Sequence, residues 1–187
     1  MEIRTLKTQY FTATSLDGYI ADENNSLDWL MQFGDGPEEN SYSAFISEVG
    51  AIAMGSTTYD WVLDNDTFKD PDAPKPWPYE QPCWIFTTRE LRRVEGADIR
   101  FVKGDVAAVH KEMAAVAAGK NIWLAGGGEL VGQFYDHGLL DELILSIAPV
   151  TLGAGAPLLP RRIVKPSLKL VSCKPLGDLF LEVRYSL

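Results

Sequence analysis

The sequence predicts an α/β sandwich with a mostly parallel sheet and an antiparallel edge. Strand-like and helical segments alternate over the first ~140 residues, which is typical of parallel sheets built from strand–helix–strand units. Two strand-like segments then follow one another, at 168–173 and 179–185, and predict an antiparallel pair. The length of 187 residues fits a single domain that spans 1–187.

Apolar runs bounded by turn residues predict the remaining strands. They lie at 8–14, 51–54, 84–87, 99–102, 121–125 and 143–148. Helices are predicted where apolar residues recur three and four positions apart, or where a capping residue opens the segment. They begin at Pro37, Ser56, Asp105 and Glu129. Loops are expected at 21–36, with one short helical turn, and at 64–82 and 151–162, which are rich in Pro or Gly.

Composition argues against several classes of function. The chain has 17 Lys and Arg against 26 Asp and Glu, a net charge of −9, so nucleic acid and anionic membrane surfaces are unfavourable partners. Cys83 and Cys173 lack the spacing of a metal site and lie in apolar, strand-like runs, which predicts buried free thiols. His110 and His137 are isolated, so no metal site is expected. No signal peptide or membrane span is recognisable, which favours a cytoplasmic protein.

Three of the expected strand ends carry residues suited to phosphate groups. They are the segments 55–58, 87–89 and 126–129. Glycine lets backbone N–H groups approach a ligand closely, and a helix N-terminus favours an anion. Each segment alone is also explained as a turn, a helix cap or a solvated charge. Together, at the carboxyl edge of one sheet, they fit an extended ligand with a pyrophosphate and a separate terminal phosphate, which is the shape of NADPH.

Four segments, in this order and spacing, resemble the dihydrofolate reductase-like superfamily. They are Ala13–Ala21, Met54–Gly55 with Thr58–Tyr59, Trp123–Gly128 and Ala148–Leu158. The chain is most similar to the reductase domain of the riboflavin-pathway deaminase–reductase and its small stand-alone bacterial relatives, over essentially its whole length. The resemblance implies a dihydrofolate reductase-like three-layer α/β/α sandwich and an NADPH-dependent oxidoreductase. Its substrate would be a small planar heterocycle, such as a pterin or the pyrimidine 5-amino-6-(5-phosphoribosylamino)uracil of riboflavin biosynthesis.

The resemblance also implies a set of cofactor-binding residues. Ala13 and Ile20 would border the nicotinamide. The pyrophosphate would lie against Gly55, Ser56, Thr57, Thr58, Gly126, Gly127, Gly128, Glu129, Leu130 and Val131. The adenosine 2′-phosphate would be held by Thr87, Thr88 and Arg89, which favours NADPH over NADH. The strained peptide that is common at the Gly-Gly pair of this family would fall between Gly126 and Gly127. Relatives of this type are often homodimers, so we expect a homodimer formed through the C-terminal strands.

The chain departs from the family pattern at three positions. Ser56 stands where Arg commonly follows Met-Gly, which removes one cation from the phosphate site. Ser41 stands where folate reductases have an acidic residue, with Glu38 and Glu39 nearby but out of register, so dihydrofolate is not the expected main substrate. Tyr19 replaces the Lys that usually follows Asp-Gly in the riboflavin-pathway domain, and it suits stacking on a planar ring.

Hydride transfer needs a proton source as well as a bound cofactor. Asp17, Tyr19 and Asp28 are the candidates near the expected nicotinamide end. Each also has a structural explanation: Asp17 as a turn residue, Tyr19 as a packing residue and Asp28 as a helix cap. A water molecule is an alternative proton source. Two rival functions stay open: a non-catalytic nucleotide-binding or regulatory module, and a purely structural dimer subunit. Among the tryptophans, Trp84 and Trp123 are expected in the core, whereas Trp29 and Trp77 are candidates for a pocket or an interface.

Overall fold

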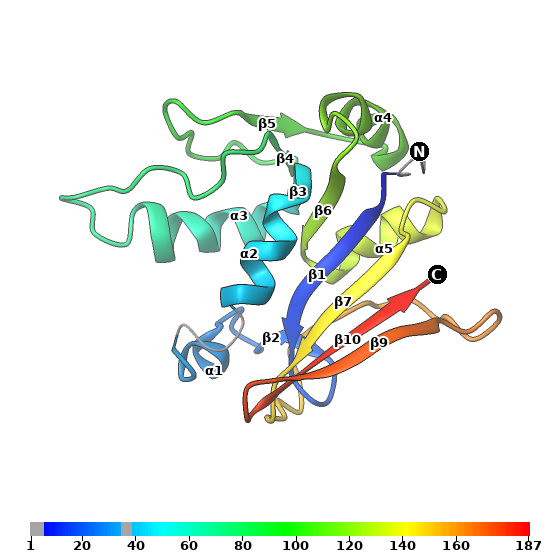
Figure 1. The fold of residues 1–187 in the computed structure, drawn as a ribbon. Coiled ribbons are helices and arrows are strands. Elements are labelled where there is room, and N and C mark those ends of the chain that lie inside the picture. The colour runs from blue at the N-terminus through cyan, green and yellow to red at the C-terminus, as the bar shows by residue number, and fades with distance from the viewer. Residues whose placement is uncertain (1–5, 35–38) are drawn as a thin grey trace.

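An eight-stranded sheet with the order β5-β4-β3-β6-β1-β7-β10-β9 forms the centre of the computed structural model, which describes residues 6–34 and 39–187 (Figure 1). The parallel strands are β1 (Thr8–Thr14), β3 (Val49–Gly55), β4 (Cys83–Phe86), β5 (Ile99–Val102), β6 (Asn121–Gly126) and β7 (Glu142–Ile147). The antiparallel edge consists of β10 (Phe180–Ser186) and β9 (Lys169–Leu176). The predicted mostly parallel sheet with an antiparallel C-terminal edge is therefore confirmed.

Helices cover both faces of the sheet, which gives three layers (Figure 1). The helices α2 (Glu39–Ser47) and α3 (Ser56–Val62) lie on one face, and α4 (Val106–Val116) and α5 (Gly128–Asp136) lie on the other. Successive strand side chains alternate between the faces. Phe11 accordingly packs with Phe45 of α2, whereas Tyr10 packs in the cluster that contains Phe134 of α5.

Local chemistry explains why these elements form. Asp105 caps α4, because its Oδ1 accepts a hydrogen bond from the backbone N of Ala107 at 2.9 Å. On the opposite face of the sheet, Phe11 stacks on Phe45 with their ring centroids 4.3 Å apart, and Trp123 meets Phe45 edge-on at 5.6 Å. Burying such aromatic side chains stabilises the fold by roughly 1.5–3 kcal/mol each, and it anchors α2 against β1.

The structure differs from the sequence-based expectations in several elements. The segment Leu63–Thr67, mostly assigned to the proline-rich loop, continues α3 as a π-helical turn. A small second sheet joins β2 (Tyr19–Ala21) to β8 (Ala156–Pro157). Neither strand is predicted from the sequence, and β8 lies within the expected loop 151–162. The short helix α1 (Asp28–Met31) matches the expected helical turn. The predicted helix start at Pro37 lies outside the described residues, and the helix ends at Ser47 rather than near Gly50.

The thiols are only partly as predicted. Cys83 is fully buried on β4, and burial raises the pKa of its thiol to about 12. Cys173 is exposed, which contradicts the expectation that both thiols are buried. The reason is that β9 is an edge strand whose residues from Lys169 to Pro175 are exposed whichever face they occupy. Within the described residues, no helix has the length and apolar character needed to cross a lipid bilayer.

Candidate functional site

A cavity of about 620 Å³ opens at the carboxyl end of the central strands, between the N-termini of α3 and α5. Most of the side chains that line it are apolar or neutral. Its lining residues that lie on or next to the two predicted glycine-containing turns are Gly55, Ser56, Thr57, Thr58, Gly126, Gly127, Gly128, Glu129 and Leu130. Ile20 of β2 also lines this cavity. The structure therefore brings together most of the residues predicted to contact a pyrophosphate and a nicotinamide.

The turn from β6 into α5 exposes backbone donors to the cavity. Gly126 has φ +131°, a conformation that favours glycine, and the peptide between Gly126 and Gly127 is cis. Gly127 is the N-cap residue of α5 and offers no side-chain cap. The first N–H groups of a helix lack partners inside the helix, so they can bind an anion. Among the predicted pyrophosphate residues, Val131 is fully buried and does not line the cavity.

The small β2–β8 sheet forms another wall of this cavity. Pro157 of β8 pairs with Tyr19 of β2, and both Ile20 and Pro157 line the cavity. The β8 segment lies directly against α5, because a Cβ atom added at Gly128 would come within 2.3 Å of the Pro157 carbonyl oxygen. Glycine at position 128 is therefore required for this close approach. Through it, the β2–β8 sheet, which carries Ile20, packs directly against α5.

A second cavity, of about 320 Å³, shares lining residues with the first and extends toward β4 and β5. Thr87 and Thr88, which the resemblance assigns to the 2′-phosphate, line it. Lys103 also lines it, and it is the only cation among the described lining residues. The sequence reasoning missed Lys103, although it directly follows the strand Ile99–Val102 and so occupies the same kind of strand end as the residues that were found.

Arg89 has a different environment from the one expected. Its Nη2 atom lies 2.7 Å from Oδ2 of Asp60 on α3, and Arg89 does not line either cavity. The side chains of both partners are substantially exposed. The assignment of Arg89 to the 2′-phosphate stays a prediction, and the ion pair with Asp60 competes with it.

Glu129 brings a negative charge to the larger cavity, close to the predicted pyrophosphate position. Arg161 binds both oxygens of Glu129 at 2.8 and 3.0 Å and also binds Asp136 at 2.9 Å. The hydrogen bonds from Arg161 hold the pKa of Glu129 below its usual range. The guanidinium lies over Gly132, where an added Cβ would come within 2.5 Å of Cζ. Arg161 thus neutralises Glu129 and fixes the segment after β8 to α5.

None of the three candidate proton donors lines either cavity. Asp17 accepts hydrogen bonds from Ser15 Oγ at 2.6 Å and from the backbone N of Gly153 at 2.7 Å, so it holds two loops together. Tyr19 is half-buried on β2, and Asp28 is exposed in the first turn of α1, where it does not act as the cap. Ala13 is half-buried and also lies outside the lining residues.

The tryptophans lie partly where the sequence predicts them. Trp84 and Trp123 are in the core, as predicted. Trp77 and Trp29 pack against hydrophobic clusters and line neither cavity, whereas Trp61, which was not singled out, lines the larger one.

Of the acidic residues near Ser41, Glu38 lies outside the described residues. Ser41 itself donates a hydrogen bond to Glu182 of β10.

Known proteins share both the sequence and the fold. The RibD C-terminal domain family matches residues 7–181. YwjB of Bacillus subtilis, itself uncharacterised, is 33% identical over 179 residues, which cover 92% of this chain and 93% of YwjB. A Shewanella sp. PV-4 protein described provisionally as a riboflavin biosynthesis protein has 26% identity and a TM-score of 0.78, with 97% of this chain and 98% of that chain covered.

Two more distant structures share the fold. A diaminohydroxyphosphoribosylaminopyrimidine deaminase/5-amino-6-(5-phosphoribosylamino)uracil reductase from Thermotoga maritima has a TM-score of 0.63 at 16% identity, with 97% of this chain and 56% of that chain covered. Dihydrofolate reductase from Enterococcus faecalis, complexed with NADP(H), has a TM-score of 0.60 at 13% identity, with 96% of this chain and 95% of that chain covered. The resemblance noted in the sequence is therefore confirmed at the level of family and fold.

Proposed function

Because the chain belongs to the RibD C-terminal domain family, we propose that it is an NADPH-dependent reductase that transfers a hydride to a small planar heterocycle. The observation that carries the proposal is that two adjacent cavities, which share lining residues such as Gly55 and Ser56, lie along the carboxyl edge of the sheet. The larger contains the α5 N-terminus, and the smaller contains Thr87, Thr88 and Lys103. This arrangement suits a dinucleotide with a central pyrophosphate and an additional phosphate at one end.

The residues of the chain divide the binding of this cofactor between them. The N–H groups at the start of α5 and the hydroxyls of Thr57 and Thr58 would bind the pyrophosphate. Thr87, Thr88 and Lys103 would bind the 2′-phosphate, with Arg89 as the alternative cation. Ile20, packed near Gly127, would hold the nicotinamide and exclude water from it. When bound, NADPH supplies the hydride.

We place the substrate beside the nicotinamide end, bounded by β1, β2 and α2. Pyrimidines and pterins are the candidate classes, and the riboflavin-pathway pyrimidine is one of them. Tyr19 is half-buried there, where its ring can pack against a planar substrate. Since Asp17, Tyr19 and Asp28 do not line the described cavities, a water molecule is the proton donor that this geometry favours.

A tryptophan-fluorescence titration with NADPH, with NADH as the control, tests the cofactor part of the proposal. The chain has five tryptophans, and Trp61 lines the larger cavity. We expect saturable quenching in the micromolar range, equivalent to about −8 kcal/mol, and tighter binding of NADPH than of NADH. If neither cofactor changes the fluorescence or the melting temperature at high excess, the proposal is wrong.

A non-catalytic nucleotide-binding or regulatory module is the second candidate function. Two observations favour it. Among the described residues that line the larger cavity, Glu129 is the only titratable side chain, and it is paired with Arg161. Ser56 also stands in place of a cation. Oxidation of NADPH in the presence of a panel of pterins, pyrimidines and quinones distinguishes the two. Turnover with any member supports the reductase, whereas cofactor binding without turnover throughout the panel favours the module.

We also propose that the chain is a single domain that forms a homodimer through β9 and β10. Leu170 and Val171 of β9 are 56% and 54% exposed, and an exposed edge strand offers unpaired backbone groups to a second copy. The purely structural dimer subunit would share this interface but would not bind NADPH. Light scattering tests the dimer, and Val171→Glu is expected to give a monomer. The free thiols of Cys83 and Cys173 suit a reducing compartment such as the cytoplasm.

A further inference from the structure

Trp61 of α3 lines the larger cavity with an aromatic ring that the core does not use. It lies one helical turn after Thr57 and Thr58, which line the same cavity, so the three side chains share one face of the helix. The side chain is half-buried. Within the described part of the chain no other aromatic ring contacts it, whereas the ring of Trp77 packs against Tyr79. The indole of Trp61 is therefore available to a ligand in the cavity.

The cavity wall on this side is uncharged. Asn25 and Leu27, from the segment that follows β2, line the cavity together with Ile20 of β2. Among the described residues that line the larger cavity, the only charged side chain is Glu129, and Arg161 binds both of its oxygens. A planar ring can pack against such a wall, whereas an anion finds no counter-charge there.

The sequence explains why this side of the cavity lacks cations. Half of the residues that line the larger cavity come from the segment 8–68, which includes β1, β2, α2, β3 and α3. No Lys, Arg or His occurs in this segment, whereas it contains eleven Asp and Glu. The elements proposed to surround the substrate, β1, β2 and α2, therefore carry no cation of their own. The field of their carboxylates repels an anion and leaves a neutral ring unaffected.

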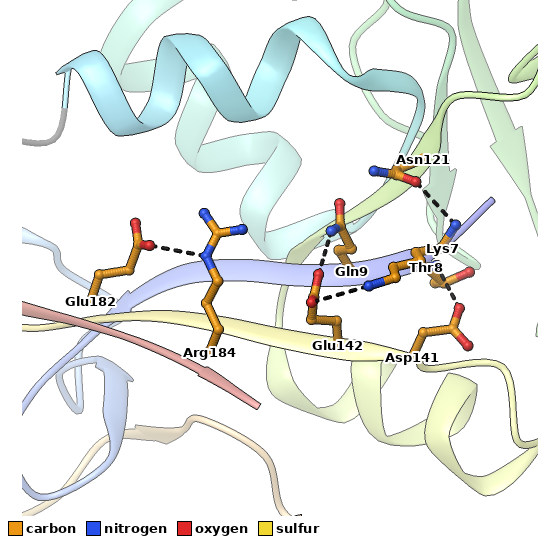
Figure 2. Close-up of polar contacts among 8 residues, drawn as sticks. All are labelled: Lys7, Thr8, Gln9, Asn121, Asp141, Glu142, Glu182 and Arg184. Carbon is orange, nitrogen blue, oxygen red and sulfur yellow. Dashed lines mark hydrogen bonds and ion pairs between the residues drawn. The ribbon is translucent and has the colours of Figure 1, made fainter. Parts of the chain in front are cut away.

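Cations on the sheet face beneath α2 are paired with buried carboxylates. Arg184 of β10 donates to Oε1 of Glu182 at 3.0 Å (Figure 2), and Lys174 of β9 lies 3.4 Å from the same atom. Toward the other end of this face, Lys7 donates to Glu142 at 3.3 Å (Figure 2). Removing a partner from a buried carboxylate leaves an uncompensated charge, which is strongly destabilising. These cations are therefore not free to bind a phosphate.

Groups suited to the phosphates of a cofactor come from other parts of the chain. The N-terminus of α5 and the side chain of Lys103 both follow residue 68 in the sequence. Lys103 lines the smaller cavity, whereas Trp61, Asn25 and Leu27 do not. The carboxyl edge of the sheet thus has an end that carries a cation and an end that is neutral.

We propose that the wall formed by Trp61, Asn25 and Leu27 is the substrate side of the larger cavity, where an uncharged planar ring stacks on Trp61 and a phosphorylated substrate is rejected. This role of Trp61 rests on the proposed function, because it concerns the substrate of the same site. The Thermotoga maritima protein described above is named as a reductase of a phosphoribosylamino-uracil. The neutral wall separates this chain from such an enzyme and excludes phosphoribosyl pyrimidines as its substrates.

Two physical effects set the expected selectivity. Stacking of a heterocycle on an aromatic side chain strengthens binding by about fivefold or more. Moving a phosphate into a site that has no counter-charge weakens binding, and we expect a loss of about tenfold or more. A ring without a phosphate gains the first effect and avoids the second.

The test compares uridine with uridine 5′-monophosphate, which differ only in the phosphate. Binding to the full chain is measured by calorimetry, without cofactor and with saturating NADP⁺, which has no hydride to transfer. We expect uridine to bind about tenfold or more tightly than the monophosphate, also when NADP⁺ is present. Trp61→Leu should weaken uridine binding about fivefold or more, whereas Trp61→Phe, which keeps a ring, should weaken it less. Both variants should bind NADP⁺ as the wild type does.

Leu27→Lys supplies the missing cation, and Leu27→Met is its matched control of similar length without a charge. Leu27 is half-buried at the N-cap position of α1, so a Lys there can pack its carbon chain and keep its ammonium group in water at the cavity. We expect Leu27→Lys to bind the monophosphate about fivefold more tightly than Leu27→Met does. Uridine should bind equally to both variants.

The outcomes separate this role from the proposed function. Equal affinity for the two probes, no binding of uridine, or uridine binding that Trp61→Leu leaves unchanged overturns the role of Trp61. Displacement of uridine by NADP⁺ also overturns it, because Trp61 would then belong to the cofactor site. A folded Leu27→Lys that gains no affinity for the monophosphate refutes selection by charge, and if this variant fails to fold, the wild-type and Trp61 comparisons still decide. Failure of NADPH to bind refutes the reductase instead, and the uridine comparison without cofactor then still reports on Trp61.

Discussion

Replacement of Lys103 by Ala should weaken NADPH binding much more than NADH binding. Lys103 follows β5 and is the one cation among the described residues that line the smaller cavity. Two unit charges ~4 Å apart interact by about 1 kcal/mol in a water-like dielectric, and the double charge of a 2′-phosphate raises this to about 2 kcal/mol before salt screening. The expected loss is thus roughly 1–2 kcal/mol, or about 5- to 30-fold in Kd. NADH lacks the phosphate and should be affected little.

Arg89→Ala provides the comparison, because Arg89 is the cation that sequence reasoning selects. Its guanidinium is already paired with Asp60 at 2.7 Å, so its field is partly neutralised and we expect a smaller change in NADPH affinity. Both variants are titrated with NADPH and NADH by tryptophan fluorescence, at two salt concentrations. Equal losses for the two cofactors in Lys103→Ala would refute the reasoning. A large, NADPH-specific loss in Arg89→Ala alone would assign the phosphate to Arg89.

Three further predictions concern stability and charge. Gly128→Ala places a Cβ 2.3 Å from the Pro157 carbonyl oxygen and should destabilise the fold by about 1–3 kcal/mol, measured as a lower melting temperature. Gly55→Ala, whose nearest atoms are 3.9 Å away, should change the melting temperature far less, and equal effects would contradict the packing argument. The hydrogen bond from Ser15, followed by the N–H groups of Gly153 and Leu152, lowers the pKa of Asp17, so its contribution to stability is present above about pH 4 and is lost as the pH falls through the lower folded-state value. The melting-temperature difference between wild type and Asp17→Asn should therefore be constant near neutral pH and shrink below about pH 4, and a difference independent of pH would exclude this linkage. Arg161→Met leaves Glu129 unpaired in the larger cavity and should weaken NADPH binding, which Glu129→Gln in the same chain should restore; no restoration would show that Arg161 acts through structure rather than charge.

Much of the fold follows from local sequence patterns. The bounds of the strands Thr8–Thr14 and Ile99–Val102 are predicted to the residue, and turn residues follow shortly after each of them. Asp105 marks the start of α4 because a capping side chain is a local signal. The β2–β8 pairing was not predicted. It joins residues more than 130 positions apart, and two-residue strands such as Ala156–Pro157 carry no periodicity.

The sequence predicts those residues of the candidate site that short local patterns mark. Glycine-rich turns after strands indicate where backbone donors face a cavity, and this finds Gly55 and Gly126. The same rule, applied to β5, would have found Lys103. The ion pair between Arg89 and Asp60 could not be predicted, because it depends on how α3 lies against the end of β4. Cys173 shows the same limit, since its apolar neighbours do not reveal that β9 is an edge.

The contact between Ser41 and Glu182 shows why the surroundings of a residue can escape a local pattern. A comparison of α2 alone finds Ser41 where folate reductases have an acidic residue, and it therefore argues against dihydrofolate as the main substrate. The structure brings the carboxylate of Glu182 to Ser41 from β10, 141 positions away. Strand pairing through Ser146 makes this contact possible, because it aligns β10 with β1 across one face of the sheet.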